Sequence, residues 1–123
     1  MFDKTNNILI VDNEEHTRLA YAEVLKLDGY KVDTAVNGLD AYKKIIKNNY
    51  DAIVTDLRMP EMDGIGFIKK LNDLKKNIPV LVITAFGNYK SYKNAKLLGV
   101  IEYLNKPIRA KDLKDAIKKI VPD

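Results

Sequence analysis

Two carboxylates, a hydroxyl and an ammonium group lie at or just after the ends of short apolar segments of this sequence. They are Asp12, Asp56, Thr84 and Lys106, which follow or close the segments 8–11, 52–55, 80–84 and 102–104. Two neighbouring carboxylates repel each other unless a cation lies between them. At about 4 Å and an effective dielectric constant near 20, the repulsion is roughly 4 kcal/mol, which an ammonium group or a bound Mg²⁺ can offset. These residue types therefore predict a site for a divalent cation and an anion, provided that the fold brings them together.

The elements that must position these side chains are short β-branched segments that alternate with longer amphipathic ones. The expected strands are 8–11, 31–35, 52–55, 80–84 and 102–104. Three of them are continuously apolar, which is typical of strands covered on both faces. Five strands joined by helices through right-handed crossovers predict a parallel sheet with helices on both faces. Ligands of such sheets bind beyond the carboxyl ends of the strands, where the four polar side chains fall.

Apolar residues recur at three- and four-residue steps between the strands and predict the packed faces of four helices. The predicted faces are Thr17, Ala20, Tyr21, Val24 and Leu27; Leu39, Tyr42, Ile45 and Ile46; Phe67, Ile68 and Leu71; and Leu113, Ala116, Ile117 and Ile120. A less apolar helix is expected over 88–98, with Tyr89 and Tyr92 as packing residues. Gly29 and Gly99 are expected to end helices, because glycine tolerates the left-handed conformation found there.

The composition predicts one small globular domain that spans residues 1–123. With 21 basic and 17 acidic residues, the formal net charge is +4. The sequence has no cysteine and a single histidine, His16, which excludes thiol catalysis, disulfides and metal sites rich in cysteine or histidine. The longest apolar runs have four residues. They are too short for a membrane span or a signal peptide, so a cytoplasmic location is expected.

Four motifs together resemble the receiver domains of bacterial two-component response regulators, the CheY-like family, over essentially the whole chain. They are ILIVDNEEHTR from Ile8, TDLRMPEMDG from Thr55, VLVITAFG from Val80 and GVIEYLNKP from Gly99. The resemblance implies a flavodoxin-like (βα)5 fold, a three-layer sandwich whose five parallel strands have the order 2-1-3-4-5. It also implies a phosphoacceptor of a two-component system or phosphorelay, and not an enzyme.

The resemblance assigns roles to residues at the expected site. Asp56 would accept a phosphoryl group from a histidine kinase or a histidine phosphotransfer protein, and Lys106 would pair with a phosphoryl oxygen. Mg²⁺ would be held by Asp56, by Asp12 and by the backbone carbonyl of Arg58. Pro107 is expected to follow a cis peptide bond that aims Lys106 inward.

Asn13 departs from the family pattern, in which two adjacent acids usually follow the first strand. An amide oxygen can coordinate Mg²⁺ but brings no charge. We therefore expect weaker metal binding and less repulsion with Asp12 and Asp56. Glu14 or Glu15 could compensate, although the start of the following helix favours a solvent-facing position for both.

The resemblance also implies a switch and an output surface. Thr84 would donate its hydroxyl to the phosphoryl group, and Tyr103 would change between an inward and an outward rotamer. The output surface would comprise the fourth helix, the fifth strand and the fifth helix, in the part of the chain where residues 88–123 hold nine basic and four acidic residues. Its candidate exposed residues are Lys90, Lys93, Lys96, Lys111, Lys114 and Lys118. An effector domain or a homodimer partner could use this surface, but solvation alone would also account for it.

Three alternative functions compete with the phosphoacceptor. A dehalogenase-like phosphatase would need an acid two residues after Asp56, where the chain has Arg58. A flavin-binding protein would need a Ser/Thr/Gly phosphate loop after the first strand, where the chain has acids. A pseudo-receiver that binds partners without phosphorylation stays open because of Asn13. Direct binding of nucleic acid or membrane by this segment is not expected.

Overall fold

Five strands and five helices alternate along the computed structural model, which describes residues 6–59, 62–85 and 87–121. In chain order they are β1 (Asn7–Val11), α1 (Glu15–Leu27), β2 (Lys31–Ala35), α2 (Gly38–Lys47), β3 (Ala52–Thr55), α3 (Gly64–Asp73), β4 (Val80–Thr84), α4 (Tyr89–Leu97), β5 (Glu102–Asn105) and α5 (Ala110–Ile120). The predicted bounds of β2, β3 and β4 are confirmed, whereas β1 begins one residue earlier and β5 ends one residue later than predicted.

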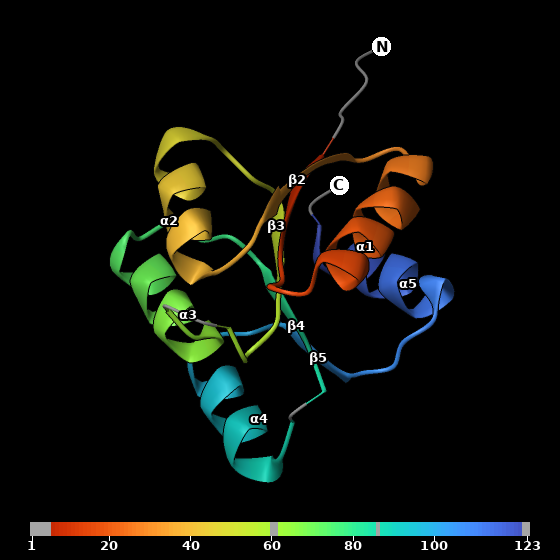
Figure 1. The fold of residues 1–123 in the computed structure, drawn as a ribbon. Coiled ribbons are helices and arrows are strands. Elements are labelled where there is room, and N and C mark those ends of the chain that lie inside the picture. Colours follow the sequence, from red (N-terminus) through yellow and green to blue (C-terminus); the bar gives the residue numbers. More distant parts are fainter. Residues whose placement is uncertain (1–5, 60–61, 86, 122–123) are drawn as a thin grey trace.

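All strand pairs are parallel, and the sheet order is β2-β1-β3-β4-β5. Helices α1 and α5 cover one face, and α2, α3 and α4 cover the other (Figure 1). This confirms the predicted three-layer, flavodoxin-like (βα)5 fold. No helix within the described ranges is both long enough and apolar enough to cross a membrane.

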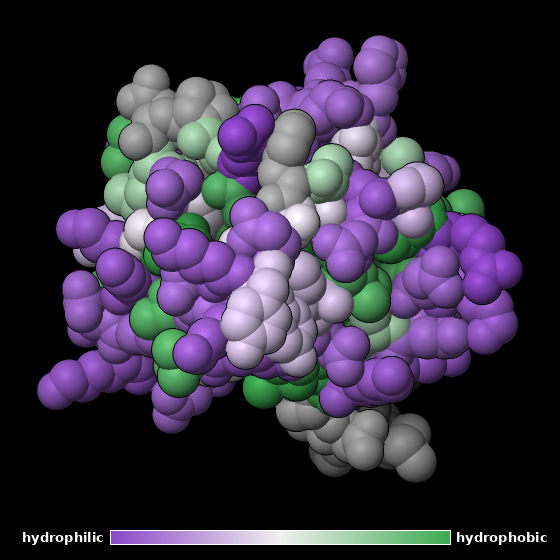
Figure 2. Space-filling view, turned by 90° about the horizontal axis from the view of Figure 1, so that it is seen from below, coloured by the Kyte–Doolittle hydropathy of each residue, from purple (hydrophilic) through white to green (hydrophobic). Residues whose placement is uncertain are grey.

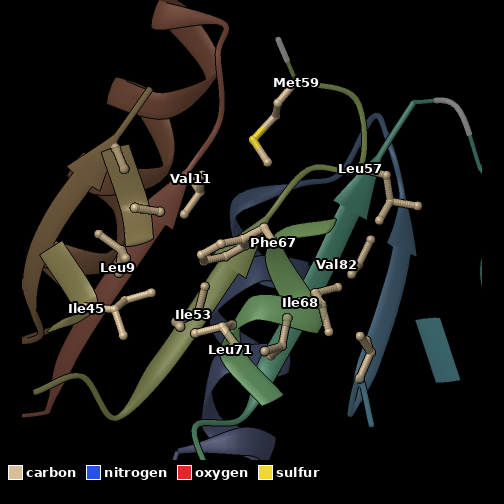
Figure 3. Close-up of a cluster of buried hydrophobic side chains, with 14 of the residues drawn as sticks. Leu9, Val11, Ile45, Ile53, Leu57, Met59, Phe67, Ile68, Leu71 and Val82 are labelled. Carbon is tan, nitrogen blue, oxygen red and sulfur yellow. The ribbon is translucent and has the colours of Figure 1, made fainter. Parts of the chain in front are cut away.

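The core has two parts because successive side chains of a strand point to opposite faces of the sheet. On β1, Leu9 and Val11 join the cluster under α2, α3 and α4, whereas Ile8 and Ile10 join the cluster under α1 and α5. Phe67 of α3 is fully buried and lies at the centre of the first cluster (Figure 3). Strands β3 and β4 are buried along their whole length, as their continuous apolarity predicts. The central strands are therefore rigid supports for the residues that follow them.

The predicted helix faces are confirmed for α3 and α5 and are partly wrong for α1 and α2. In α1 the buried residues are Ala22 and Leu25, whereas Leu27, a predicted core residue, is 79% exposed. In α2, Leu39 and Ile46 are 39% and 51% exposed and are not part of the buried core. Both helices carry apolar residues on two adjacent stripes, so the three- and four-residue spacing alone does not identify the stripe that packs.

Helix ends follow the predicted pattern, but the tyrosines of α4 do not. Gly29 and Gly99 adopt φ values of 97° and 95° after α1 and α4, which confirms them as helix-ending glycines. Tyr89 is 77% exposed and is not a packing residue. Tyr92 is partly exposed and packs with one side against Tyr103. Only Ala95 of α4 is buried, which agrees with the prediction that this helix is the least apolar.

Candidate functional site

Three charged residues extend the sheet by one position beyond its strands. The backbone N–H of Asp12 donates to the carbonyl of Ala35, and that of Asp56 donates to the carbonyl of Val11. The Lys106 N–H donates to the carbonyl of Thr84. Each of the three backbones is thus fixed to the neighbouring strand at the carboxyl edge of the sheet. This end of the molecule, at the bottom in Figure 1, is mostly hydrophilic when seen from below (Figure 2).

Asp12, Asp56 and Lys106 meet in one ion-pair cluster. The Lys106 Nζ atom lies 2.7 Å from Asp56 Oδ2 and 3.0 Å from Asp12 Oδ2. Both aspartates are buried, with exposed fractions of 3% for Asp12 and 5% for Asp56. The peptide bond between Lys106 and Pro107 is cis, as predicted. The expected convergence of these three side chains is therefore present in the structure.

One ammonium group contacts two carboxylates in this cluster. Burial by itself would lower the pKa of Lys106, but its hydrogen bonds to Asp56 and Asp12 and their negative charges raise that pKa above its ordinary value. Lys106 therefore carries a proton at neutral pH. Two carboxylates thus face a single ammonium group, an imbalance that favours the binding of a further cation.

The second oxygen of Asp56 is held by the backbone of the following loop. Asp56 Oδ1 accepts hydrogen bonds from the N–H groups of Leu57 (2.6 Å) and Arg58 (3.2 Å). The first turn of α3 closes on this loop at Gly64, whose N–H donates to the carbonyl of Leu57. A Cβ atom on Gly64 would lie 2.6 Å from Leu57 Cα, so only glycine allows this approach. The side chain of Asp56 is thereby fixed in orientation.

An open pocket of about 650 Å³ gives access to the cluster. Its lining residues are Asp12, Asn13, Glu14, Asp56, Arg58, Met59, Ala85 and Lys106. Asn13 and Arg58 thus lie beside the cluster, as the sequence predicts, but their coordination of a metal stays a prediction. Thr84 ends β4 as a fully buried residue directly before Ala85, and its role stays a prediction too.

Glu14 has a structural role that the sequence did not reveal. It is exposed and lines the pocket, and it also caps α1: its Oε1 accepts hydrogen bonds from the Thr17 N–H (3.2 Å) and hydroxyl (2.5 Å). The hydrogen bond from the Thr17 hydroxyl is the main cause that lowers the pKa of Glu14. Its backbone N–H donates to Asp12 Oδ1 at 2.9 Å. Glutamate is an uncommon cap, so its residue type provided little reason to expect this arrangement.

Tyr103 belongs to a separate arrangement on the α4 side of the sheet. It lines a shallow pocket with Gly87, Asn88, Tyr89, Tyr92 and Asn105. Its hydroxyl oxygen lies 2.7 Å from Ser91 Oγ, a contact that sequence reasoning missed. Asn88 is a favoured N-cap residue type, which marks the start of α4 but gives no sign of the contact between Ser91 and Tyr103.

The oxygen atoms of the pocket fit a metal that keeps part of its water shell. Within the ranges that the structure describes, no group of three His, Cys, Asp or Glu residues is arranged to hold a metal ion. Two buried carboxylates, Asp12 and Asp56, line the pocket together with the amide of Asn13. Mg²⁺ commonly binds through one or two carboxylates and retains several waters, whereas a site enclosed entirely by protein ligands is unusual for it.

Comparison with known proteins gives concordant results. The family model for the response regulator receiver domain matches residues 8–118. Sporulation initiation phosphotransferase F of Bacillus subtilis is 35% identical over 115 residues, covering 94% of this chain and 93% of that protein. The prediction that the domain extends over all of residues 1–123 stays a prediction.

Solved structures share the fold over nearly the whole chain. The chemotaxis protein CheY4 of Vibrio cholerae superposes with a TM-score of 0.89 at 28% identity, covering 96% of this chain and 100% of the other. The response regulator TrrA of Thermotoga maritima, solved in complex with Mg²⁺-BeF, gives a TM-score of 0.86 at 32% identity and covers 95% of this chain and 100% of its own. The chain therefore belongs to the response regulator receiver domain family, whose members are signalling modules.

Proposed function

We propose that Asp56 accepts a phosphoryl group from a phosphorylated histidine of a sensor kinase or phosphotransfer protein. The main support is the buried Asp56 carboxylate, which contacts Lys106 at 2.7 Å and lines an open pocket. A carboxylate can attack phosphorus without a general base. In the transfer, an oxygen of Asp56 bonds to phosphorus as the bond between phosphorus and the donor nitrogen breaks. The expected cytoplasmic location stays a prediction.

The neighbouring residues suit the charge that the transfer develops. Lys106 already sits against Asp56 and can pair with a phosphoryl oxygen through a charge-assisted hydrogen bond. Thr84 ends the adjacent strand, and its hydroxyl is assigned to a second phosphoryl oxygen. Asp12, Asp56 and the carbonyl of Arg58 are the proposed ligands of Mg²⁺, with Asn13 as a neutral addition. When bound, Mg²⁺ offsets negative charge on the transferring group.

The partner surfaces follow from the positions of α1, α4 and α5. We assign kinase docking to the side of α1, which begins beside the pocket. The output surface consists of α4, β5 and α5. Because α4 and α5 lie on opposite faces of the sheet (Figure 1), the two helices flank the edge strand β5 from both sides. An acidic effector surface or a second copy of the chain fits this edge.

Incubation with acetyl phosphate and Mg²⁺ tests the proposed function. The protein should gain the mass of one phosphoryl group, and hydroxylamine should remove it because an acyl phosphate is susceptible to this nucleophile. Peptide mapping should place the group on Asp56. A protein that gains no mass, although it is folded and Mg²⁺ is present, would instead be a pseudo-receiver, the alternative that Asn13 favours.

Replacing Asn13 by aspartate should strengthen Mg²⁺ binding by about tenfold, because the number of charged ligands is a main determinant of affinity at such sites. Without Mg²⁺, the same change should lower the free energy of unfolding, since a third carboxylate then lies beside Asp12 and Asp56. Tyrosine fluorescence during a Mg²⁺ titration measures the affinity. Urea unfolding in EDTA measures the stability.

Asn94→Asp is the matched control for this experiment. It adds the same charge at an exposed position of α4, away from the pocket lining. We expect it to leave Mg²⁺ affinity nearly unchanged. Equal affinities for the wild type and Asn13→Asp would rule out a role for Asn13 in the metal site.

A further inference from the structure

Two contacts hold Tyr103 of β5 against the first turns of α4. Its hydroxyl oxygen lies 2.7 Å from Ser91 Oγ. Its ring meets that of Tyr92 edge to face, with centroids 5.3 Å apart and an interplanar angle of 85°. Ser91 and Tyr92 are consecutive residues of α4, so the Tyr103 side chain and the start of this helix form one packed unit.

The hydroxyl oxygen of Ser91 contacts both the backbone of Asn88 and the hydroxyl of Tyr103. Ser91 Oγ accepts from the N–H of Asn88 and donates to the carbonyl of Asn88, both at 3.0 Å. A serine hydroxyl has one donor and two acceptor positions. Its single proton can go to the Asn88 carbonyl or to the Tyr103 hydroxyl, so either hydroxyl can be the donor of their shared bond. Ser91 thus completes the capping box of α4 and holds Tyr103 with the same oxygen.

Gly87 provides the space that Tyr103 needs in this position. A Cβ atom at residue 87 would lie 2.7 Å from the Tyr103 hydroxyl and would also overlap the side-chain oxygen of Asn105. Both atoms are at the ends of side chains that can move. An added methyl group would therefore displace the Tyr103 hydroxyl from Ser91 while leaving the backbone in place.

We propose that Ser91 is a positioning residue that holds Tyr103 on α4 in the unphosphorylated protein and opposes its change of rotamer. This inference rests on the proposed phosphorylation of Asp56, which must supply enough free energy to break the bond. After Tyr103 leaves, Ser91 keeps its two bonds to Asn88. Of the hydrogen bonds that Ser91 makes, only the one with Tyr103 would then depend on whether Asp56 is phosphorylated.

A double-mutant cycle with Ser91→Ala and Tyr103→Phe tests this role. Urea unfolding of the four proteins in EDTA should give a coupling factor of roughly 2 to 12 in the unfolding equilibrium constant, the range of a typical net hydrogen bond. Repeating the cycle with Mg²⁺ and beryllofluoride, a phosphoryl mimic, should reduce the coupling factor to near 1. In the wild-type background, Tyr103→Phe removes the bond that opposes the change of rotamer, so it should tighten beryllofluoride binding. In the Ser91→Ala background that bond is already absent, so the same substitution should have a smaller effect.

Three further variants separate positioning from simple stabilisation. Ser91→Thr retains the hydroxyl and should restore the coupling. Gly87→Ala leaves both partners intact and should still weaken it. Tyr89→Phe removes a tyrosine hydroxyl from a side chain that is 77% exposed on the same helix, so it should show no coupling to Ser91→Ala.

Two results of the cycle would overturn the inference. A coupling factor of 1 in EDTA would mean that the bond contributes nothing in the free protein. An equal factor with and without beryllofluoride would make Ser91 a structural residue that does not respond to the site. If the wild type binds no beryllofluoride, the proposed function fails and the regulatory role with it, while the coupling in EDTA still reports whether the bond exists.

Discussion

Replacement of Lys106 by methionine should lower the free energy of unfolding by roughly 3–5 kcal/mol at neutral pH in EDTA, the usual loss when a buried ion pair keeps only its charged partner. Lys106 is the only cation that contacts both buried carboxylates, Asp12 and Asp56, among the salt bridges of the described residues. Methionine fills a similar volume but leaves two like charges in a buried position. The loss therefore arises from charge and not from a cavity.

Mg²⁺ should restore part of the stability that Lys106→Met loses. The ammonium group of the wild type occupies oxygens that the metal would also use, so the variant should bind Mg²⁺ more tightly. A ligand that binds only the folded state adds stability in proportion to the logarithm of its concentration over its dissociation constant. Urea unfolding in EDTA and in Mg²⁺ should show a larger metal-induced gain for Lys106→Met than for the wild type.

Lys111→Met provides the control for the loss of a lysine. Lys111 lies 2.8 Å from Asp115, but the two side chains are 75% and 52% exposed. Exposed pairs contribute about 0–1 kcal/mol, so this variant should lose at most that amount. Equal losses for the two variants would refute the charge argument for Lys106.

The contribution of Lys106 also has a defined dependence on pH. Its pKa is raised in the folded protein by Asp56 and Asp12 against the opposing effect of burial. A lysine whose pKa is higher in the folded than in the unfolded state contributes its full stabilisation below the unfolded pKa, which is about 10.4. This contribution falls as the pH rises through the pKa of the folded state. The stability difference between the wild type and Lys106→Met should therefore be constant near neutral pH and shrink above about pH 10.

The sequence predicts the sheet and the central cluster for the same physical reason. The apolar segments of β3 and β4 are buried from end to end, so their composition alone identifies them as strands covered on both faces. Parallel strands then place their carboxyl ends at one edge, which brings Asp56 and Lys106 together although 50 residues separate them. The chemistry of this edge follows from topology and needs no knowledge of side-chain packing.

What the sequence does not predict depends on contacts between elements. Leu27 continues the apolar spacing of α1, yet Leu25 packs and Leu27 is exposed, because the helix is rotated to suit the sheet and α5 beneath it. The partner of Tyr103 could not be identified either. Ser91 precedes it by 12 residues and reaches it only after α4 packs beside β5. Local patterns carry no information on such pairings.

Asp56→Asn should abolish phosphoryl uptake from acetyl phosphate and, at the same time, make the protein more stable by about 1 kcal/mol. The reason for the stability gain is the charge of the cluster. Asp12 and Asp56 contact the same Lys106 nitrogen, at 3.0 and 2.7 Å, so their repulsion at an effective dielectric near 20 is roughly 3 kcal/mol. Losing the charge-assisted bond between Lys106 and Asp56 costs about 2 kcal/mol. That net cost already includes the desolvation of the buried Asp56 carboxylate, which offsets most of its direct attraction to Lys106. The relief of repulsion from Asp12 therefore decides the sign of the expected change.

Unlike Lys106→Met, this variant leaves no uncompensated charge. Lys106 and Asp12 remain as a balanced pair, and the asparagine oxygen can still accept the N–H groups of Leu57 and Arg58 that Asp56 Oδ1 accepts in the wild type. Most substitutions of buried residues destabilise a protein, so a gain in stability would be a specific signature of carboxylate repulsion. Urea unfolding in EDTA measures the sign, and intact mass measures phosphoryl uptake.

Asp12→Asn separates the gain in stability expected for Asp56→Asn from the loss of phosphoryl uptake. It removes the same repulsion and leaves the pair of Lys106 with Asp56, so it should also raise the free energy of unfolding. It keeps the Asp56 carboxylate, however, and a phosphoryl group should still appear there, at a lower rate because a proposed ligand of Mg²⁺ is lost. Phosphoryl uptake by Asp56→Asn would show that another residue is the acceptor. Loss of stability in both asparagine variants would instead mean that the attraction to Lys106 exceeds the carboxylate repulsion.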